Sequence, residues 1–195
     1  QGIPFWLIAL FAIIAFDFVD YVNHRMMHLR WLWPIHAVHH SDHDLNAFTS
    51  FRVHFLEAFF MRGTYIVGLG WMGIPPEAAG IGAVYLMIHN MYVHTNIDWD
   101  HGPLNWLIAS PRFHQWHHAD KPAAYGKNLS NLCPMWDMMF GTYYVPGPCD
   151  LPTHTQEVEH ASPISLILAP FQMWGRMVRR RFGKAVPLIH SGERN

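Results

Sequence analysis

Hydrophobic residues are concentrated in three long segments of the chain. Residues 2–16 contain no charged side chain, residues 55–74 form a second apolar segment, and residues 78–93 form a third. The first segment is shorter than the roughly 20 residues that a helix needs to span a bilayer. We therefore expect it either to continue as a helix through Asp17 and Asp20 or to be cut short at its start. A buried core helix is the alternative interpretation.

The second and third apolar segments are separated by a turn signal, IPPE at residues 74–77. Two apolar segments joined by a tight turn predict a helical hairpin. If the hairpin enters or crosses the bilayer, both of its ends lie on the same side. The regions around His54 and His94 would then share one membrane face.

The rest of the chain is more polar. Residues 95–160 are rich in His, Trp and Pro and predict a compact cap with loops. Residues 162–195 form a C-terminal tail, apolar at first and interrupted by Pro163 and Pro170. A basic cluster beside an apolar segment indicates the cytoplasmic side and can bind anionic lipid, although a solvated charged tail is the alternative. The basic residues are Arg176, Arg179, Arg180, Arg181 and Lys184.

Composition favours a membrane protein. Hydrophobic residues make up 51% of the 195 residues and charged residues 14%, whereas a soluble domain carries about 25% charged residues. The net charge of −1 indicates no general attraction to nucleic acid. Cys133 and Cys149 are too few for a disulfide framework and fit a reducing compartment. Because the chain begins at Gln1 inside an apolar run, we interpret it as a single domain, 1–195, that lacks N-terminal membrane helices.

Histidines are crowded where the first apolar segment ends. His24 and His28 are spaced i, i+4, so on a helix they share one face. Asp17, Asp20 and Tyr21 precede them and give an apolar helix a polar stripe. Ionisable groups at membrane depth are costly and usually functional.

Two further histidine groups have the spacing HxxHH, HAVHH at residues 36–40 and HQWHH at residues 114–118. Pro34 suits the first turn of a short helix that would aim the first group at one point. Ser110 and Pro111 suit the N-cap and first position of a helix that carries the second group. Two such units, each just after a proline, are not expected by chance.

The three groups supply eight imidazoles, and one tetrahedral metal uses about four ligands. Eight imidazoles therefore indicate two metal ions. Neutral imidazole suits Zn, Cu, Fe and Ni, so histidines do not identify the metal. The chain has no HExxH motif, so the usual zinc-protease pattern lacks its general base.

Other residues are weaker candidates. His94 follows the third apolar segment and returns to the same face, so we expect it to be a ligand. His89 lies five residues earlier, off that helical face, and is a further candidate. Asp20, His54 and Asp137 are candidates for hydrogen bonds to the ligands; for Asp137, capping a turn before Gly141 is the alternative.

The boxes and their flanks resemble the fatty acid hydroxylase superfamily, also called the sterol desaturase family. HRMMH, HAVHH and HQWHH match its HxxxH, HxxHH and HxxHH boxes. The flanks DYVNHRMMH, WPIHAVHHSD, GPLNWLIASPRFHQWHH and KNLSNLCPMWDMMFGTYY agree as well. The resemblance covers roughly residues 17 to 145. Three boxes in order, with the hairpin between the second and the third, make it highly specific.

The resemblance implies an all-α integral membrane protein, with transmembrane helices, a helical hairpin and a cytosol-facing cap that holds a dinuclear metal site. It implies two iron ions as cofactor and O₂ as co-substrate, for hydroxylation, desaturation or ether cleavage of a sterol, fatty acyl or related lipid chain. His94 matches an additional family histidine, and His89 or Asn90 would supply a further ligand. The catalytic metal ligands that carry over are His24, His28, His36, His39, His40, His114, His117 and His118.

Partners and location follow from the same resemblance. No haem motif or nucleotide-binding glycine pattern is present, so we expect a separate electron-donor protein, either cytochrome b5-like, a ferredoxin or a reductase. The compact loops favour a bacterial inner membrane over the endoplasmic reticulum. A histidine-rich membrane metal transporter is one alternative function, although transporters usually place ligands at the bilayer midplane. A zinc-dependent hydrolase is the other, with Asp42 and Asp44 as the nearest carboxylates.

Overall fold

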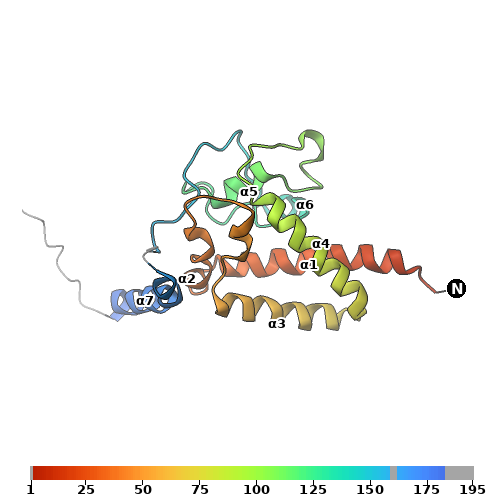
Figure 1. Ribbon diagram of the computed structural model, residues 1–195, viewed down its shortest axis with the longest axis horizontal. Coiled ribbons are helices and arrows are strands. Elements are labelled where there is room, and N and C mark those ends of the chain that lie inside the picture. Colours follow the sequence, from red (N-terminus) through yellow and green to blue (C-terminus); the bar gives the residue numbers. More distant parts are fainter. Residues whose placement is uncertain (1, 159–161, 183–195) are drawn as a thin grey trace, which may run out of the picture.

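The computed structural model describes residues 2–158 and 162–182, and these residues contain helices but no strand (Figure 1). Lys184, which belongs to the predicted basic cluster, lies outside the described residues. The helices are α1 (Phe5–Met27), α2 (Trp33–His36), α3 (Phe55–Trp71), α4 (Pro76–Val93), α5 (Pro111–His118), α6 (Met135–Phe140) and α7 (Pro163–Phe182), with the 3₁₀ helices η1 (His39–Ser41), η2 (Ala47–Phe51) and η3 (Gly102–Leu104).

Helix α1 continues through Asp17 and Asp20. This confirms one of the two expectations for the first apolar segment. Within the described residues it is the one helix long and apolar enough to cross a membrane. The Asp17 carboxylate accepts hydrogen bonds from the backbone N–H groups of Leu132 and Cys133, at 2.8 and 3.0 Å, and from the Trp136 indole at 2.9 Å. The polar stripe of α1 therefore faces the cap and fixes the loop before α6.

The predicted hairpin is present as α3 and α4, and both helices pack against α1 (Figure 1). Small residues allow close approach. The backbone of α1 at Ala12 lies so near Gly82 of α4 that a Cβ there would meet the Ala12 carbonyl oxygen at 3.4 Å. A Cβ at Gly68 of α3 would meet the Val19 side chain at 3.3 Å. Residues His54 and His94, which cap α3 and α4, lie at the same end of the hairpin.

Large apolar side chains cover the outer surfaces of these three helices. Soluble monomers rarely expose apolar patches this extensive, so the surface fits contact with lipid. Examples that are more than half exposed are Trp6, Phe11, Phe55, Phe59, Ile66, Val67, Trp71, Val84 and Ile88.

The cap contains α5 and α6 and lies on one side of α1 (Figure 1). Helix α5 begins as predicted, because the Ser110 hydroxyl accepts a hydrogen bond from the Phe113 N–H at 3.2 Å and Pro111 occupies the first turn. Helix α6 ends at Gly141, whose φ of 72° is the left-handed conformation that glycine adopts without strain. The cap thus presents α5 to the ends of α1 and α4.

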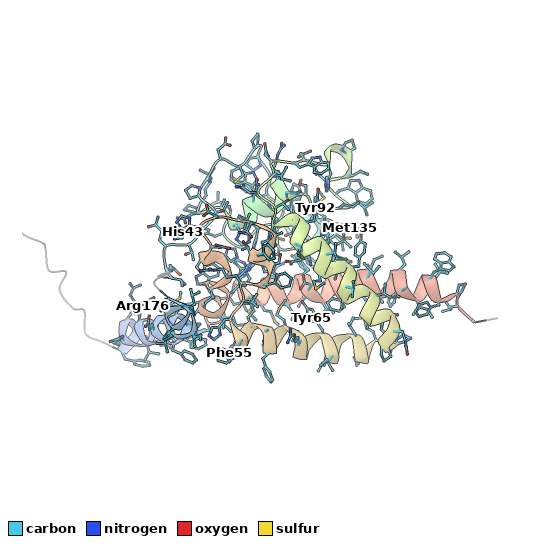
Figure 2. All side chains as sticks on the ribbon, viewed as in Figure 1. His43, Phe55, Tyr65, Tyr92, Met135 and Arg176 are labelled. Atoms are coloured by element: carbon cyan, nitrogen blue, oxygen red, sulfur yellow. The ribbon has the colours of Figure 1, made fainter. Side chains whose placement is uncertain are left out.

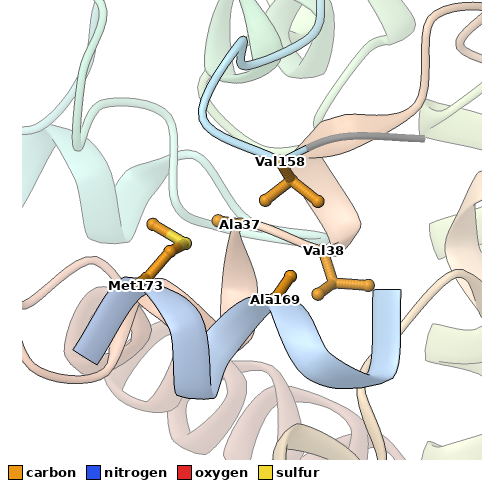
Figure 3. Packing of buried hydrophobic residues seen from close by; sticks show 5 residues of the cluster. All are labelled: Ala37, Val38, Val158, Ala169 and Met173. Atoms are coloured by element: carbon orange, nitrogen blue, oxygen red, sulfur yellow. The ribbon is translucent and has the colours of Figure 1, made fainter. Parts of the chain in front are cut away.

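Helix α7 contradicts the expected interruption at Pro170, because it continues through that residue. Its Ala169 and Met173 side chains pack on Ala37 and Val38, in a cluster completed by Val158 (Figure 3). This packing covers the segment that carries HAVHH, and the helix continues although Pro170 has no backbone N–H to donate.

Candidate metal centre

Three separate parts of the chain deliver imidazoles to one place. His24 lies in the last turn of α1 and His28 caps it, with ring centroids 5.2 Å apart. His36 ends α2, whereas His39 and His40 lie in η1. The HAVHH histidines are therefore carried by two short helices rather than by the single helix expected after Pro34.

The remaining imidazoles come from α5 and from the end of α4. His114, His117 and His118 lie on α5 and are buried, and His94 caps α4. The His114 and His94 ring centroids are 4.2 Å apart. The hairpin thus returns the chain to the centre, as its sequence predicts.

The nine side chains form two adjacent groups, in each of which the ligand nitrogens all lie within 4.8 Å of one another. Each HxxHH box is divided between the two groups. The stacked rings of His40 and His118, with centroids 4.3 Å apart, connect them. Cluster A consists of His24, His28, His36, His40 and His117, and cluster B of His39, His94, His114 and His118.

Hydrogen bonds in cluster A set the imidazole tautomers. His24 Nδ1 lies 2.7 Å from the carbonyl oxygen of Leu129, and His36 Nδ1 lies 2.7 Å from Glu57 Oε1. A carbonyl or carboxylate oxygen only accepts, so both Nδ1 atoms carry the proton and both Nε2 atoms carry a lone pair. These Nε2 atoms face each other at 3.0 Å. Without a shared cation the contact is repulsive, so the arrangement fits a metal ion.

Cluster B gives the same result. His94 Nδ1 lies 2.7 Å from the carbonyl oxygen of Asn90, which leaves a lone pair on its Nε2. That Nε2 lies 3.1, 3.0 and 3.3 Å from the Nε2 atoms of His39, His114 and His118. Imidazoles bound to one metal at about 2.1 Å place neighbouring nitrogens about 3.0–3.4 Å apart. The spacing in cluster B therefore fits four ligands of one metal ion.

Burial keeps these imidazoles neutral, the form that binds metal. The pKa of His40, His117 and His118 is held well below its ordinary value, first by burial and then by neighbouring imidazoles, which disfavour a second positive charge. His117 Nδ1 also lies 2.7 Å from the Lys127 carbonyl oxygen, which directs its Nε2 toward cluster A.

Four predicted residues lie elsewhere. His89 is in neither cluster, because it lies on α4 more than one turn before His94, and its ring packs on Tyr92. Asp20 accepts a hydrogen bond from the Tyr65 hydroxyl. His54 Nδ1 caps α3 by accepting from the Leu56 N–H, and its Nε2 lies 3.1 Å from the Ile167 carbonyl oxygen.

The hydrogen bonds of Asp137 go to backbone and hydroxyl groups and not to an imidazole, contrary to the prediction. Its carboxylate accepts from the Leu129 N–H at 2.8 Å, from the Ser130 N–H and hydroxyl at 2.9 and 2.5 Å, and from the Thr142 hydroxyl at 2.6 Å. Asp137 thus holds the backbone of Leu129, and the Leu129 carbonyl oxygen accepts a hydrogen bond from His24 Nδ1. Asp137 therefore affects the centre through this loop and does not contact an imidazole itself.

Sequence reasoning missed Glu57, the partner of His36. It is 4% exposed on a mainly apolar helix whose other charged residue is Arg62. An ionisable residue in such a segment is itself a functional signal. The segment FRVHFLE at residues 51–57 could therefore have pointed to Glu57. The backbone carbonyls that orient His24, His94 and His117 have no sequence signal, since every residue type carries one.

Two cavities reach the clusters. One, the apolar cavity, has a volume of about 470 Å³ and lies among α1, α3 and α4. Phe16, Met61 and Leu86 line it, together with polar side chains that include Glu57 and Arg62. The other, the arginine-lined cavity, has a volume of about 910 Å³. They share no lining residue. The apolar cavity touches His24, His36, His39, His94 and His114, and the arginine-lined cavity touches His28, His40, His117, His118, Arg30, Arg176 and Arg180.

The sequence similarity of this chain to known proteins identifies its family. The family model described as fatty acid hydroxylase matches residues 9–142, which contain every residue of both clusters. The chain belongs to the fatty acid hydroxylase family. This confirms the resemblance carried by the three boxes. No solved structure gave a significant match.

Several curated proteins resemble this fatty acid hydroxylase family member. Alkylglycerol monooxygenase from Xenopus tropicalis is 31% identical over 134 residues, 67% of this chain and 29% of the relative. Ornithine lipid hydroxylase OlsE from Rhizobium tropici is 33% identical over 137 residues, 69% of this chain and 41% of the relative. Very-long-chain aldehyde decarbonylase GL1-11 from Oryza sativa is 28% identical over 147 residues, 72% of this chain and 55% of the relative. The chain thus spans only part of each relative's length.

Replacing Glu57 with alanine is expected to lower metal affinity about 10–100-fold, the usual cost of losing a partner that orients a ligating imidazole. Without the carboxylate, His36 can rotate or change tautomer. Metal content after dialysis against graded chelator concentrations measures the effect. Glu57→Gln, which keeps an acceptor oxygen for Nδ1, should lose less, and Glu77→Ala on the exposed start of α4 should lose nothing. If Glu57→Ala and the wild-type protein bound metal with equal affinity, Glu57 would not orient His36 for metal binding.

Proposed function

We propose that this chain catalyses O₂-dependent oxidation of an alkyl chain in a membrane lipid, with two iron ions as cofactor. The observation that carries the proposal is the pair of adjacent imidazole clusters, of which His24, His36, His39, His94 and His114 line the apolar cavity. The family, and relatives named as lipid monooxygenase and lipid hydroxylase, support it.

The nine imidazoles of clusters A and B would hold the iron pair. With five imidazoles in cluster A and four in cluster B, each ion would have four or five nitrogen ligands. When bound, the iron pair would supply the activation of O₂ and the removal of hydrogen from an unactivated C–H bond, which acid–base side chains cannot achieve. His89 and Asn90 are not needed for this count.

The chain's own residues bind, orient and exclude water. Apolar side chains of α1, α3 and α4 would accept the alkyl chain from the bilayer, since the outer surfaces of the same helices are apolar. Glu57 and the carbonyls of Leu129, Asn90 and Lys127 hold Nδ1 protons and keep the imidazoles aimed. The position of one carbon relative to the clusters then selects hydroxylation, desaturation or ether cleavage.

A zinc hydrolase is less well supported, because the carboxylates nearest the boxes serve other contacts. Glu57 is bonded to His36, and Asp42 accepts a hydrogen bond from the Thr49 hydroxyl at 2.7 Å. A metal transporter would place its ligands near the middle of spanning helices, whereas both clusters lie at the ends of α1 and α4 and on the short helices α2, η1 and α5.

Metal analysis of anaerobically purified protein, combined with O₂ uptake and lipid mass spectrometry, tests the proposal. Alkylglycerols, ornithine lipids and fatty acyl lipids are the candidate substrates, with a cytochrome b5-like protein, a ferredoxin or a reductase as electron donor. The expected result is two iron ions per chain and O₂ uptake that matches an oxidised lipid product. A zinc pair with hydrolysis products, or metal uptake into proteoliposomes without lipid oxidation, would overturn it.

Replacing Ala58 with tryptophan is expected to lower kcat/KM for a long-chain lipid roughly tenfold or more, because Ala58 lines the apolar cavity and a larger side chain excludes substrate methylenes. Metal content should not change. Phe59→Trp is the matched control, since the neighbouring Phe59 side chain is 80% exposed. If a long-chain and a short-chain lipid were oxidised by Ala58→Trp with wild-type kcat/KM, the alkyl chain would not occupy this cavity.

A further inference from the structure

Helix α7 has two apolar faces. One face, with Ala169 and Met173, is buried against the HAVHH segment (Figure 3). The residues of the other face recur at intervals of three, four and seven, so they lie on one side of the helix. This side is exposed and faces away from Ala169 and Met173. Its members are Ile164, Ile167, Leu168, Phe171, Val178 and Phe182, which are 44–78% exposed.

The charge on α7 is of one sign. Between residues 163 and 182 the helix carries four arginines, at positions 176 and 179–181, and no acidic residue. In the described part of the chain the ion pairs join His36 to Glu57 and Arg112 to Asp98 and Asp100. Within residues 2–158 and 162–182, no carboxylate forms an ion pair with an α7 arginine, so in this part of the chain the positive charge of the helix lies beside an exposed apolar stripe without a paired acidic group.

The position of α7 matches a membrane surface. The axes of α1 and α3 run across the view of Figure 1, whereas α7 is seen closer to end-on, at the end of the molecule away from the α3–α4 turn. Phe55, at the start of α3, lies beside α7 (Figure 2), and the His54 side chain contacts the Ile167 carbonyl. The helix thus lies beside the start of α3 and is inclined to the axes of α1 and α3.

Aromatic side chains support the same placement. The Trp174 indole N–H donates to the Trp31 carbonyl oxygen at 2.9 Å, and the Trp31 side chain is 47% exposed. Tryptophan is enriched at membrane–water interfaces, where an apolar ring with one polar group is favoured. Because Trp174 belongs to α7, this hydrogen bond holds the segment of Trp31 beside the helix.

We propose that α7 is an interfacial helix whose exposed apolar stripe enters the headgroup region of a bilayer and whose arginines bind anionic phospholipid headgroups. A helix with one apolar face, basic flanks and low overall hydrophobicity lies in the interface plane. A second copy of the chain is a poorer occupant, because face-to-face contact would bring eight arginines together with no acidic residue from either helix.

The test uses the whole protein in lipid nanodiscs with a fluorophore on α7. One variant, Val178→Cys, places the label on the stripe, and the other, Gln172→Cys, places it on the polar flank. Both carry Cys149→Ala, and the remaining Cys133 is buried. The discs contain phosphatidylcholine and phosphatidylglycerol, and one of the two lipids has brominated acyl chains that quench the label on contact.

Strong quenching is expected at position 178 and weak quenching at position 172, with brominated phosphatidylglycerol more effective than brominated phosphatidylcholine. Replacing Arg176, Arg179 and Arg181 with glutamine should reduce this lipid preference, by up to about fivefold for each arginine that reaches the headgroups. The same three positions changed to lysine should keep the preference, which controls for folding. Absence of quenching at position 178, or a preference that survives the glutamine changes, would overturn the proposal.

Discussion

Replacing His118 with alanine is expected to abolish lipid oxidation while leaving most of the helical fold intact. The Nε2 of His118 lies 3.2 and 3.3 Å from those of His114 and His94, so the change removes one of four nitrogens in cluster B. Its ring also stacks on His40 of cluster A. The loss should exceed the ~10–100-fold typical of partners that only orient a ligand. Product formation and metal ions per chain measure it, and the metal count should fall from two toward one.

The matched control is His43→Ala. His43 belongs to neither cluster, and its ring packs on His154 with centroids 4.1 Å apart. That variant should retain both metal ions and activity. A purified His118→Ala protein that oxidised lipid at the wild-type rate would contradict the assignment of cluster B.

Replacing Asp137 with alanine is expected to lower the free energy of unfolding by about 3–5 kcal/mol, since four buried or partly buried donors would lose their acceptor at once. Domains are stable by only about 5–15 kcal/mol. Thermal or denaturant unfolding in detergent, followed by helical circular dichroism, measures the change. Metal affinity should fall too, because the loop of Leu129 holds the Nδ1 proton of His24.

Asp150→Ala is the control for Asp137, because Asp150 is exposed in the same cap. It should unfold like the wild-type protein. If Asp137→Ala were as stable as this control, the hydrogen bonds to residues 129, 130 and 142 would not hold the loop.

Much of the fold could be predicted because it depends on local patterns. The turn signal at residues 74–77 gave the hairpin, and Ser110 with Pro111 gave the start of α5. Spacings of three and four residues aim histidines in one direction on a helix. The chain therefore carried enough local information to predict which histidines converge.

The division of histidines between clusters could not be predicted. His36 and His40 join cluster A while His39 joins cluster B, because α2 ends after His36 and a 3₁₀ helix redirects the chain. The continuation of α7 through Pro170 could not be predicted either, because it depends on packing against Ala37 and Val38. Partners distant in sequence, such as the Leu129 carbonyl for His24, arise only when the chain folds.

The two cavities touch different histidines, which has a kinetic consequence. A hydrocarbon that fills the space among α1, α3 and α4 leaves the arginine-lined opening free, so small water-soluble reagents and bound lipid need not compete for one route. Inhibition by a water-soluble chelator should then be noncompetitive with respect to lipid, and the order in which lipid and reductant bind should be random.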